Sequence, residues 1–280
     1  MKLSVLLKKH IDKKQLQIMM DLGLKHKRAI VGGSTAGIGQ AIAIELSKQG
    51  VEVVLLARDE EKLKQTLSKL STEEGQQHAY VVADFNHPEE VNEKVRGYLS
   101  DKTVDILINN TGGPAAGKAS EALTENYINA FNQHLVCNQY LLKAVLPGMK
   151  EKGFGRVINI ISTSVKQPLP NLGVSNTIRG AVANWAKTLA NELGAFGITV
   201  NNVLPGATMT GRLESIIQNK SAKSGASIEE EAKNMQSAIP ADRFAEPVEI
   251  AHAALFLASE RAGYINGVNL PVDGGRLSCL

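Results

Sequence analysis

Seven short runs of β-branched and aliphatic residues recur along this chain, separated by longer segments with the apolar spacing of helices. The runs cover residues 28–31, 52–56, 78–83, 105–109, 156–161, 199–203 and 268–271. Parallel strands need connections long enough to hold a helix, and this alternation supplies them. We therefore expect an α/β fold, a doubly wound, seven-stranded parallel sheet with helices on both faces.

The domain organisation is expected to be simple. The 280 residues contain no linker rich in Gly, Pro or Ser and no internal repeat, so residues 20–280 are expected to form one catalytic domain. The Lys-rich residues 1–19 are interpreted as an N-terminal extension: a disordered arm, an interface helix, or the product of an upstream start codon. The polar residues 211–239 have the length and position of a substrate loop or lid.

Composition excludes several classes of function. The formal net charge of +3, with 21% charged and 43% hydrophobic residues, is typical of an ordinary globular protein, and no nucleic-acid partner is expected. No stretch of 18 apolar residues occurs, so no membrane span is expected. Cys137 and Cys279 lie far apart with no metal-ligand spacing. This predicts reduced thiols, a cytoplasmic location and no metal site.

A glycine-rich segment follows the first predicted strand and opens a helix. It reads Gly32-Gly33-Ser34-Thr35-Ala36-Gly37-Ile38-Gly39. Glycines at this spacing let the backbone turn tightly and bring its N–H groups, together with the positive end of the helix, close to an anion. In a βα context, the segment indicates a site for the phosphates of a dinucleotide.

The end of the second predicted strand bears on which dinucleotide binds. An NAD site usually has an acidic residue there, whereas an arginine suits the 2′-phosphate of NADP. The strand ends at Ala57 and is followed by Arg58, which favours NADP(H) and leaves NAD(H) open. Arg58 could instead be a solvated charge at a helix start, and Asp59 either a helix N-cap or the ribose ligand.

Further motifs follow in a fixed order. After the glycine segment come VAD at 82–84, NNTG at 109–112, NVLPGATMT at 202–210, and a closing YING at 264–267 with VDGG at 272–275. With these motifs the chain resembles the short-chain dehydrogenase/reductase family over residues 22–275. Within that family it is most similar to the branch of 3-oxoacyl-(acyl-carrier-protein) reductases.

The resemblance implies a Rossmann fold with strand order 3-2-1-4-5-6-7, an NAD(P)-dependent oxidoreductase, and a small carbonyl or alcohol as substrate. It also implies a homo-oligomer, a tetramer or dimer, formed through the helices after Glu125 and Gly173 and the last strand. Asp84, expected beside the adenine, could alternatively cap the helix near Pro88, and Asn110 could be a turn former. The residues expected to bind the cofactor are Gly33, Ser34, Thr35, Gly37, Ile38, Gly39, Arg58, Asp84, Phe85, Asn110, Thr111, Gly112, Arg179, Pro205, Gly206, Thr208 and Thr210.

The family's catalytic relay uses Asn, Ser, Tyr and Lys, and this chain departs from that pattern. Ser162 matches the serine. Thirteen residues on, Ser175 occupies the tyrosine position, and Arg179 occupies the lysine position four residues later. His134 stands at the asparagine position. An aliphatic hydroxyl is a much weaker acid than a phenol, and arginine does not give up its proton at ordinary pH, so Ser175 and Arg179 are poor proton donors.

Two other residues are candidates for the missing proton donor. Lys166 follows Ser162 in a loop at the carboxyl end of a strand, where it could act as acid or base, clamp a substrate carboxylate, or simply be exposed. His134 has a suitable intrinsic pKa, but its place within a helix is equally typical of a buried structural histidine.

Three functions are compatible with this pattern. The leading one is an NADP-preferring oxidoreductase that transfers a hydride to or from a carbon held near Ser162. The alternative is an NADP(H)-binding sensor or assembly partner with little or no redox turnover. A non-redox lyase or dehalogenase-like activity is the weakest, because relatives of that kind keep the tyrosine and have a degraded glycine loop.

Overall fold

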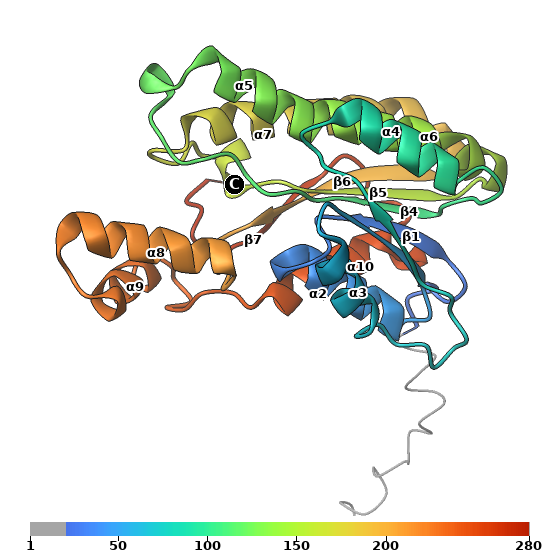
Figure 1. The fold of residues 1–280 in the computed structure, drawn as a ribbon, viewed down its shortest axis with the longest axis horizontal. Coiled ribbons are helices and arrows are strands. Elements are labelled where there is room, and N and C mark those ends of the chain that lie inside the picture. Colours follow the sequence, from blue (N-terminus) through green and yellow to red (C-terminus); the bar gives the residue numbers. More distant parts are fainter. Residues whose placement is uncertain (1–20, 280) are drawn as a thin grey trace, which may run out of the picture.

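The computed structural model describes residues 21–279, and the predicted extension at residues 1–19 lies outside them. One sheet of seven parallel strands forms the centre, in the order β3-β2-β1-β4-β5-β6-β7 (Figure 1). The predicted class, strand number and order are therefore confirmed. The order reverses direction between β1 and β4, and this is where a doubly wound sheet opens a crevice at the carboxyl ends of its strands.

The strands fall within a few residues of their predicted positions. On one side of the crevice lie β1 (Arg28–Gly32), β2 (Glu52–Ala57) and β3 (Ala79–Val82). On the other side lie β4 (Ile106–Asn109), β5 (Gly155–Ile160), β6 (Ile198–Pro205) and β7 (Asn269–Val272). β3 is shorter than predicted. His78 precedes it, and the Nδ1 of its ring accepts a hydrogen bond from the Val53 amide at 3.0 Å.

Helices cover both faces of the sheet, as Figure 1 shows. One layer contains α2 (Gly37–Lys48), α3 (Glu60–Leu67) and α10 (Pro247–Ala258), and the other contains α4 (Pro88–Tyr98), α5 (Thr124–Phe131), α6 (Cys137–Lys152) and α7 (Gly173–Leu193). Each layer has its own buried core. Ile42, Leu63 and Ile250 belong to the first, and Val91, Leu141 and Leu189 to the second. Because both faces are buried, the strands are mostly apolar, and buried polar residues in them such as Asn159 and Asn202 are hydrogen-bonded within the fold.

Residues 211–239, predicted as a polar loop or lid, are largely helical. They form α8 (Gly211–Ser224) and α9 (Ile228–Gln236), which project beyond the carboxyl end of the sheet (Figure 1). Leu213 and Ile217 of α8 pack with Ile239 and Phe244 in a small separate core. The polar residues face solvent, and the few apolar ones fix the pair of helices against the strand ends.

Four asparagines form a buried ladder across β4, β5, β6 and β7. Asn109 donates from its side-chain amide to Asn159, Asn159 to Asn202, and Asn202 to Asn269, each at 2.8 Å. These residues are direct partners in the strand register. The ladder therefore holds β4, β5, β6 and β7 in register across this half of the sheet.

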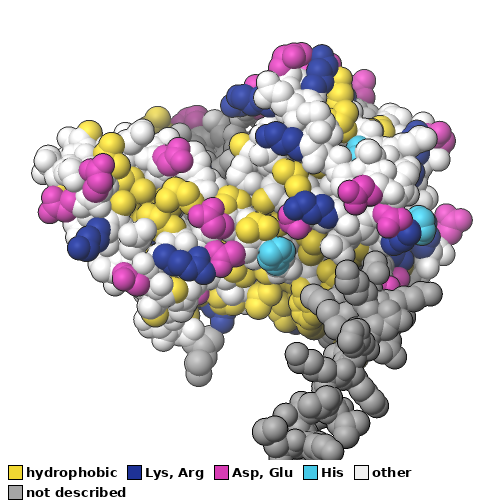
Figure 2. Space-filling view, turned by 90° about the horizontal axis from the view of Figure 1, so that it is seen from below, with side chains coloured by type: hydrophobic (Ala, Val, Ile, Leu, Met, Phe, Trp, Pro, Cys, Tyr) yellow, Lys and Arg dark blue, Asp and Glu magenta, His cyan; other side chains and the backbone are white. Residues whose placement is uncertain are grey.

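The surface shows no large area of one charge on the side seen in Figure 2, which includes α8, α9 and α10. Hydrophobic side chains there are interspersed with acidic and basic ones (Figure 2). Within residues 21–279, no helix is long and apolar enough to cross a membrane. The same residues contain no cluster of three or more His, Cys, Asp or Glu suited to a metal ion.

Candidate active site

The glycine segment between β1 and α2 forms a cradle of backbone. Gly33 and Gly37 have positive φ values of 55° and 54°, which residues with a Cβ rarely adopt. A Cβ on Gly39 would collide with the Gly33 carbonyl oxygen and would lie 2.6 Å from the Asn110 amide nitrogen. That amide holds the turn from the opposite side, because it donates to the carbonyls of Gly32 and Gly33 at 3.1 and 3.3 Å.

The cradle fits the phosphates of a dinucleotide. The amino end of α2 begins at Gly37, so its free N–H groups and the positive end of its dipole face this turn. Ser34 is fully buried, and its hydroxyl has no hydrogen-bond partner among the described residues. A buried hydroxyl without a partner is costly to the fold, so a polar ligand group at this turn would be stabilising.

The other predicted contacts in this half are placed as follows. The backbone carbonyl of Thr35 accepts a hydrogen bond from the Gln40 side chain, and Ile38, in the first turn of α2, packs against the buried core of that layer. Phe85 is buried, and its ring lies 3.2 Å from a Cβ built on Gly32. Thr111 and Gly112 follow β4 at the crevice edge, Thr111 half-buried and Gly112 exposed.

The region expected to bind the adenine contains a pair of opposite charges. Arg58 follows β2 and lies 3.7 Å from Asp84, which follows β3, and the Arg58 side chain is 73% exposed. Asp59 is the N-cap of α3, where it accepts from the Lys62 amide. The N-cap of α4 is His87, so the alternative of Asp84 as that cap is wrong; its Oδ1 accepts from Asn86 instead. Arg58 is thus the exposed cation available to a 2′-phosphate.

The opposite end of the crevice is built by the turn after β6. A Cβ on Gly206 would lie 2.7 Å from the Cα of Asp273, so only glycine fits this approach between β6 and the end of β7. Thr208 is buried, and its hydroxyl donates to the Gly206 carbonyl. Thr210 is the N-cap of α8, with its hydroxyl accepting from the Leu213 amide. Pro205 through Thr210 therefore present a rigid edge to a flat ligand.

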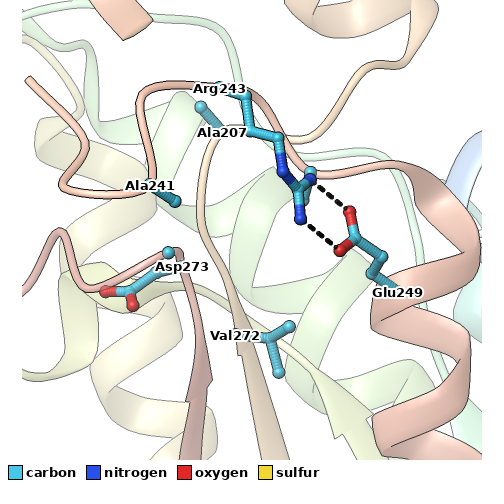
Figure 3. Close-up of a pocket in the computed structure, with 8 residues that line it drawn as sticks. Ala207, Ala241, Arg243, Glu249, Val272 and Asp273 are labelled. Carbon is cyan, nitrogen blue, oxygen red and sulfur yellow. Dashed lines mark hydrogen bonds and ion pairs between the residues drawn. The ribbon is translucent and has the colours of Figure 1, made fainter. Parts of the chain in front are cut away.

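A small pocket lies next to this edge. It is lined by residues of the β6–α8 turn, the end of β7 and the start of α10. Figure 3 shows Arg243 and Glu249 facing each other there, with Nη1 and Nη2 each 2.7 Å from a carboxylate oxygen. This pair lowers the pKa of Glu249 to about 2. Both charges are thereby satisfied within the fold, and the pocket contains none of the predicted catalytic residues.

Ser162 and Lys166 flank a short turn at the end of β5. Ser162 is the N-cap of the 3₁₀ turn Thr163–Val165, and its hydroxyl accepts from the Ser164 amide at 3.1 Å. Lys166 ends the same turn and is half-buried. The turn packs against α7, which carries Ser175 and Arg179. The structure therefore places Ser162 at the crevice, beside the helix predicted to complete the relay.

Ser175 and Arg179 lie one helical turn apart on the buried face of α7, 7% and 8% exposed. The Arg179 guanidinium donates through Nη1 to the Ile160 carbonyl at 2.9 Å, while its Nε has no partner among the described residues. Burial, and secondarily the Arg212 guanidinium, lowers the pKa of Arg179 to about 10. Arg179 is still charged at neutral pH, so it can bind a ligand but is a poor proton donor.

His134 lies in a π-helical turn, Asn132–Val136, between α5 and α6. The residue is 1% exposed, and its Nε2 has no hydrogen-bond partner among the described residues. Burial holds the pKa of His134 well below its usual range, with Arg179 and Arg212 acting in the same direction. The ring is therefore neutral at physiological pH, and the charged groups that perturb it are cations.

One residue that sequence reasoning missed is Arg212, at the start of α8. Its Nη2 donates to the Pro114 carbonyl at 2.9 Å, so it joins α8 to the loop that follows β4. The predicted segment 211–239 includes this residue, but nothing in the local sequence distinguishes it from the other polar residues there. Only the approach of two loops distant in sequence brings it to the crevice.

Comparison with known proteins identifies the family. The family model described as enoyl-(acyl carrier protein) reductase matches residues 33–276. The chain belongs to the short-chain dehydrogenase/reductase family. It is therefore an NAD(P)-dependent oxidoreductase, as the motifs predicted.

Three relatives show how far the similarity extends. The 3-oxoacyl-(acyl-carrier-protein) reductase FabG of Haemophilus influenzae is 35% identical, over 90% of this chain and 98% of its own. The NADPH-dependent reductase BacG of Bacillus subtilis is 28% identical, over 92% and 100%. The L-sorbose reductase of Gluconobacter frateurii, solved with NADPH and L-sorbose, superposes with a TM-score of 0.88 at 32% identity, over 93% and 100%.

Proposed function

We propose that this protein is an NADP(H)-dependent reductase of a small carbonyl compound, similar to the 3-oxoacyl reductases, whose proton relay lacks the usual tyrosine and lysine. The observation that carries the proposal is the crevice itself. The glycine cradle and the buried Ser34 hydroxyl lie at one end of the crevice. Ser162 lies just beyond the end of β5, and Arg179 lies in the second turn of α7. The NADPH dependence of BacG and the NADPH bound in the sorbose reductase structure support the preference for NADP(H).

In this proposal the chain's residues orient the reactants. The nicotinamide, when bound, supplies or accepts the hydride at its C4. Ser162 holds the carbonyl oxygen of the substrate by a hydrogen bond, and Arg179 holds the cofactor ribose. Arg58 binds the 2′-phosphate, and the Pro205–Thr210 edge holds the carboxamide. The remaining cofactor contacts are those predicted from the family motifs.

The proton for the carbonyl oxygen is proposed to come from Lys166. Ser175 remains too weak an acid, and His134, neutral and buried, carries no proton to spare at physiological pH. Lys166 is half-buried at the end of the turn that begins at Ser162. The expected cost of losing a positioned acid is about 10²- to 10⁴-fold in rate.

The test is single-turnover oxidation of bound NADPH. Wild-type protein loaded with NADPH is mixed with a panel of ketones, aldehydes and oxo acids, and absorbance at the nicotinamide band is followed in a stopped-flow instrument. The proposal predicts oxidation with at least one compound, slowed in Lys166→Met and abolished or nearly so in Ser162→Ala. If NADPH binds at micromolar concentration and no compound oxidises it, the sensor or assembly function replaces the reductase.

Cofactor preference is tested separately through Arg58. Arg58→Ala removes the exposed cation at the end of β2, and we expect the Kd of NADPH to rise tenfold or more while that of NADH stays within twofold. Equal weakening of both cofactors would contradict a 2′-phosphate contact. Lys62→Ala, an exposed cation on the adjoining helix, is the matched control.

The proposal includes a homo-oligomer, a dimer or tetramer, and a cytoplasmic location. Large apolar side chains stay exposed at one of the expected surfaces, with Leu123, Ile128 and Phe131 at 66%, 53% and 42% on and beside α5, and Phe256 is 42% exposed on α10, which was not among the expected surfaces. Exposed apolar groups concentrated on helices are typical of subunit contacts. Light scattering of the purified protein measures the subunit number directly.

A further inference from the structure

The crevice contains a second guanidinium, that of Arg212, held in place from two sides. Its Nη2 donates to the Pro114 carbonyl at 2.9 Å. Its Nη1 packs so closely on Gly113 that a Cβ there would collide with it. The residue as a whole is exposed, yet this packing desolvates the guanidinium and lowers its pKa. An arginine fixed in this way is positioned for a ligand rather than free in solvent.

Arg212 acts together with two buried groups. It lies near enough to Arg179 and His134 to lower the pKa of each by electrostatic repulsion. These groups come from three separate elements: the start of α8, the buried face of α7 and the π-helical turn before α6. The π-helical turn packs directly on α7. One side of the crevice therefore concentrates basic groups.

No acidic side chain balances these charges within residues 21–279. Every ion pair found there uses a cation other than Arg179 and Arg212. No carboxylate is among the groups that perturb Arg179, Arg212 or His134. Two buried atoms also have donor or acceptor capacity to spare, the Nε of Arg179 and the Nε2 of His134. Buried charge of one sign is costly unless a group of the opposite sign meets it.

We propose that the substrate carries an anionic oxygen group, a carboxylate or a phosphate, beside the carbonyl that is reduced, and that Arg212 binds this group, with the positive charge of Arg179 adding to the attraction. The planar fork of the Arg212 guanidinium suits such oxygens, and charge-assisted hydrogen bonds of this kind are about twice as strong as neutral ones. His134, close to both arginines, adds a neutral ring whose Nε2, without a partner among the described residues, can form a hydrogen bond. Oxo acids and phosphorylated carbonyl compounds are thereby the substrate class. This inference rests on the proposed reductase function.

The cofactor's pyrophosphate presents the same chemistry, so the test must separate the two sources. Arg212 is joined to the loop after β4 and perturbs the relay-position residues Arg179 and His134, and this favours the substrate. Thr210, two residues earlier, lies against Gly37 of the glycine cradle, so the cofactor is tested as well. If Arg212 instead served the cofactor, its removal would weaken NADP⁺ itself.

The experiment measures binding without turnover. The protein is saturated with NADP⁺, and calorimetry compares pyruvate, acetoacetate, levulinate and glyceraldehyde 3-phosphate with uncharged counterparts, the three methyl esters and glyceraldehyde. Wild-type protein should bind at least one anion tenfold more tightly than its counterpart. Arg212→Gln should abolish that preference, Arg212→Lys should restore part of it, and Lys223→Gln, at the far end of the same helix, should leave it unchanged.

Each contrary result overturns the inference. It fails if no anion of the panel binds at millimolar concentration, if the uncharged counterparts bind equally well, or if Arg212→Gln keeps the preference. It also fails if Arg212→Gln weakens NADP⁺ tenfold while leaving the anion preference intact, because the group bound would then be the cofactor's. Melting curves of the variants establish that they are folded. Preferential anion binding without NADPH oxidation would support the basic pair and reject only the reductase proposal.

Discussion

Asn159 donates its side-chain amide to Asn202 at 2.8 Å, across β5 and β6, with the two residues 0% and 1% exposed. The same Asn159 accepts from Asn109 on the other side. Both functions of one buried amide are thus used, and both partners depend on it. A buried polar group is stable only when it is hydrogen-bonded, and Asn159 is the hydrogen-bond partner of both Asn109 and Asn202.

Removing the middle of the ladder should destabilise the fold. Asn159→Ala leaves the amide nitrogen of Asn109 and the carbonyl oxygen of Asn202 without a partner, at about 1–3 kcal/mol for each. We expect the free energy of unfolding to fall by about 2–5 kcal/mol in a urea titration. Asn219→Ala, at an exposed position of α8, should change it by less than about 0.5 kcal/mol. Equal losses in both variants would show that the ladder has no special role.

The phosphate cradle should fail when Gly39 is enlarged. The Cβ of Gly39→Ala would collide with the Gly33 carbonyl, so the backbone must shift where the phosphates are expected to bind. We expect NADPH affinity to fall at least tenfold in a fluorescence titration. Gly97→Ala is the control, because nothing lies within 4 Å of a Cβ there. In that control, affinity should be unchanged and the free energy of unfolding should rise by about 0.5–1 kcal/mol, since alanine is the better helix former.

The two substituted relay positions should behave differently from each other. Arg179→Met removes charge-assisted hydrogen bonds worth about 1.5–3 kcal/mol, so NADPH affinity should fall by tenfold or more. Ser175→Ala should leave affinity unchanged and lower the single-turnover rate by less than tenfold, because its hydroxyl is too weak an acid to donate the proton. A large rate loss in Ser175→Ala with normal affinity would assign the proton transfer to that hydroxyl.

Stability should depend on His134 in the acid range. Burial depresses the pKa of the folded ring well below 6.5, so as the pH falls below about 6.5 the unfolded chain takes up a proton that the folded protein refuses. The contribution is fully present above that pH and declines at up to about 1.4 kcal/mol per pH unit beneath it. Urea titrations between pH 7.5 and 5 should therefore show a steeper decline in wild type than in His134→Asn. Parallel curves would mean that His134 titrates normally.

The sheet could be predicted from the sequence because its signals are local. Runs such as 52–56 and 156–161 are mainly apolar on both faces, apart from Glu52, Arg156 and Asn159, as is typical of strands covered by helices, and the glycine spacing at Gly33–Gly39 reflects a backbone shape that few other residues permit. The Asp59 cap follows from an equally short pattern, whereas the order of the strands was implied by the resemblance to the family. Strand ends were less accurate, as at His78, since they depend on which neighbour the backbone meets.

The crevice could be predicted only in part. Ser162, Ser175 and Arg179 follow from counting along family motifs, whereas Arg212 depends on the approach of α8 to Pro114, 98 residues earlier. The environment of His134 likewise depends on a π-helical turn and on cations from two other elements. No local pattern contains that information. The polar sequence of 211–239 indicated a loop because its helices bury only a few side chains.

The π-helical turn also sets a limit on how this chain can change. Residues 124–152 run as one helical rod in which the turn Asn132–Val136 accommodates a wider ring of hydrogen bonds than α5 and α6 on either side. Deleting one residue within it would restore a regular helix with little rotation of α5 against α6, because the π turn takes up one extra residue. Buried Ala130 would stay on the inner face, while the widened turn that carries His134 would be gone. Point substitutions can vary the chemistry of this position, but a single-codon deletion would remove the position itself.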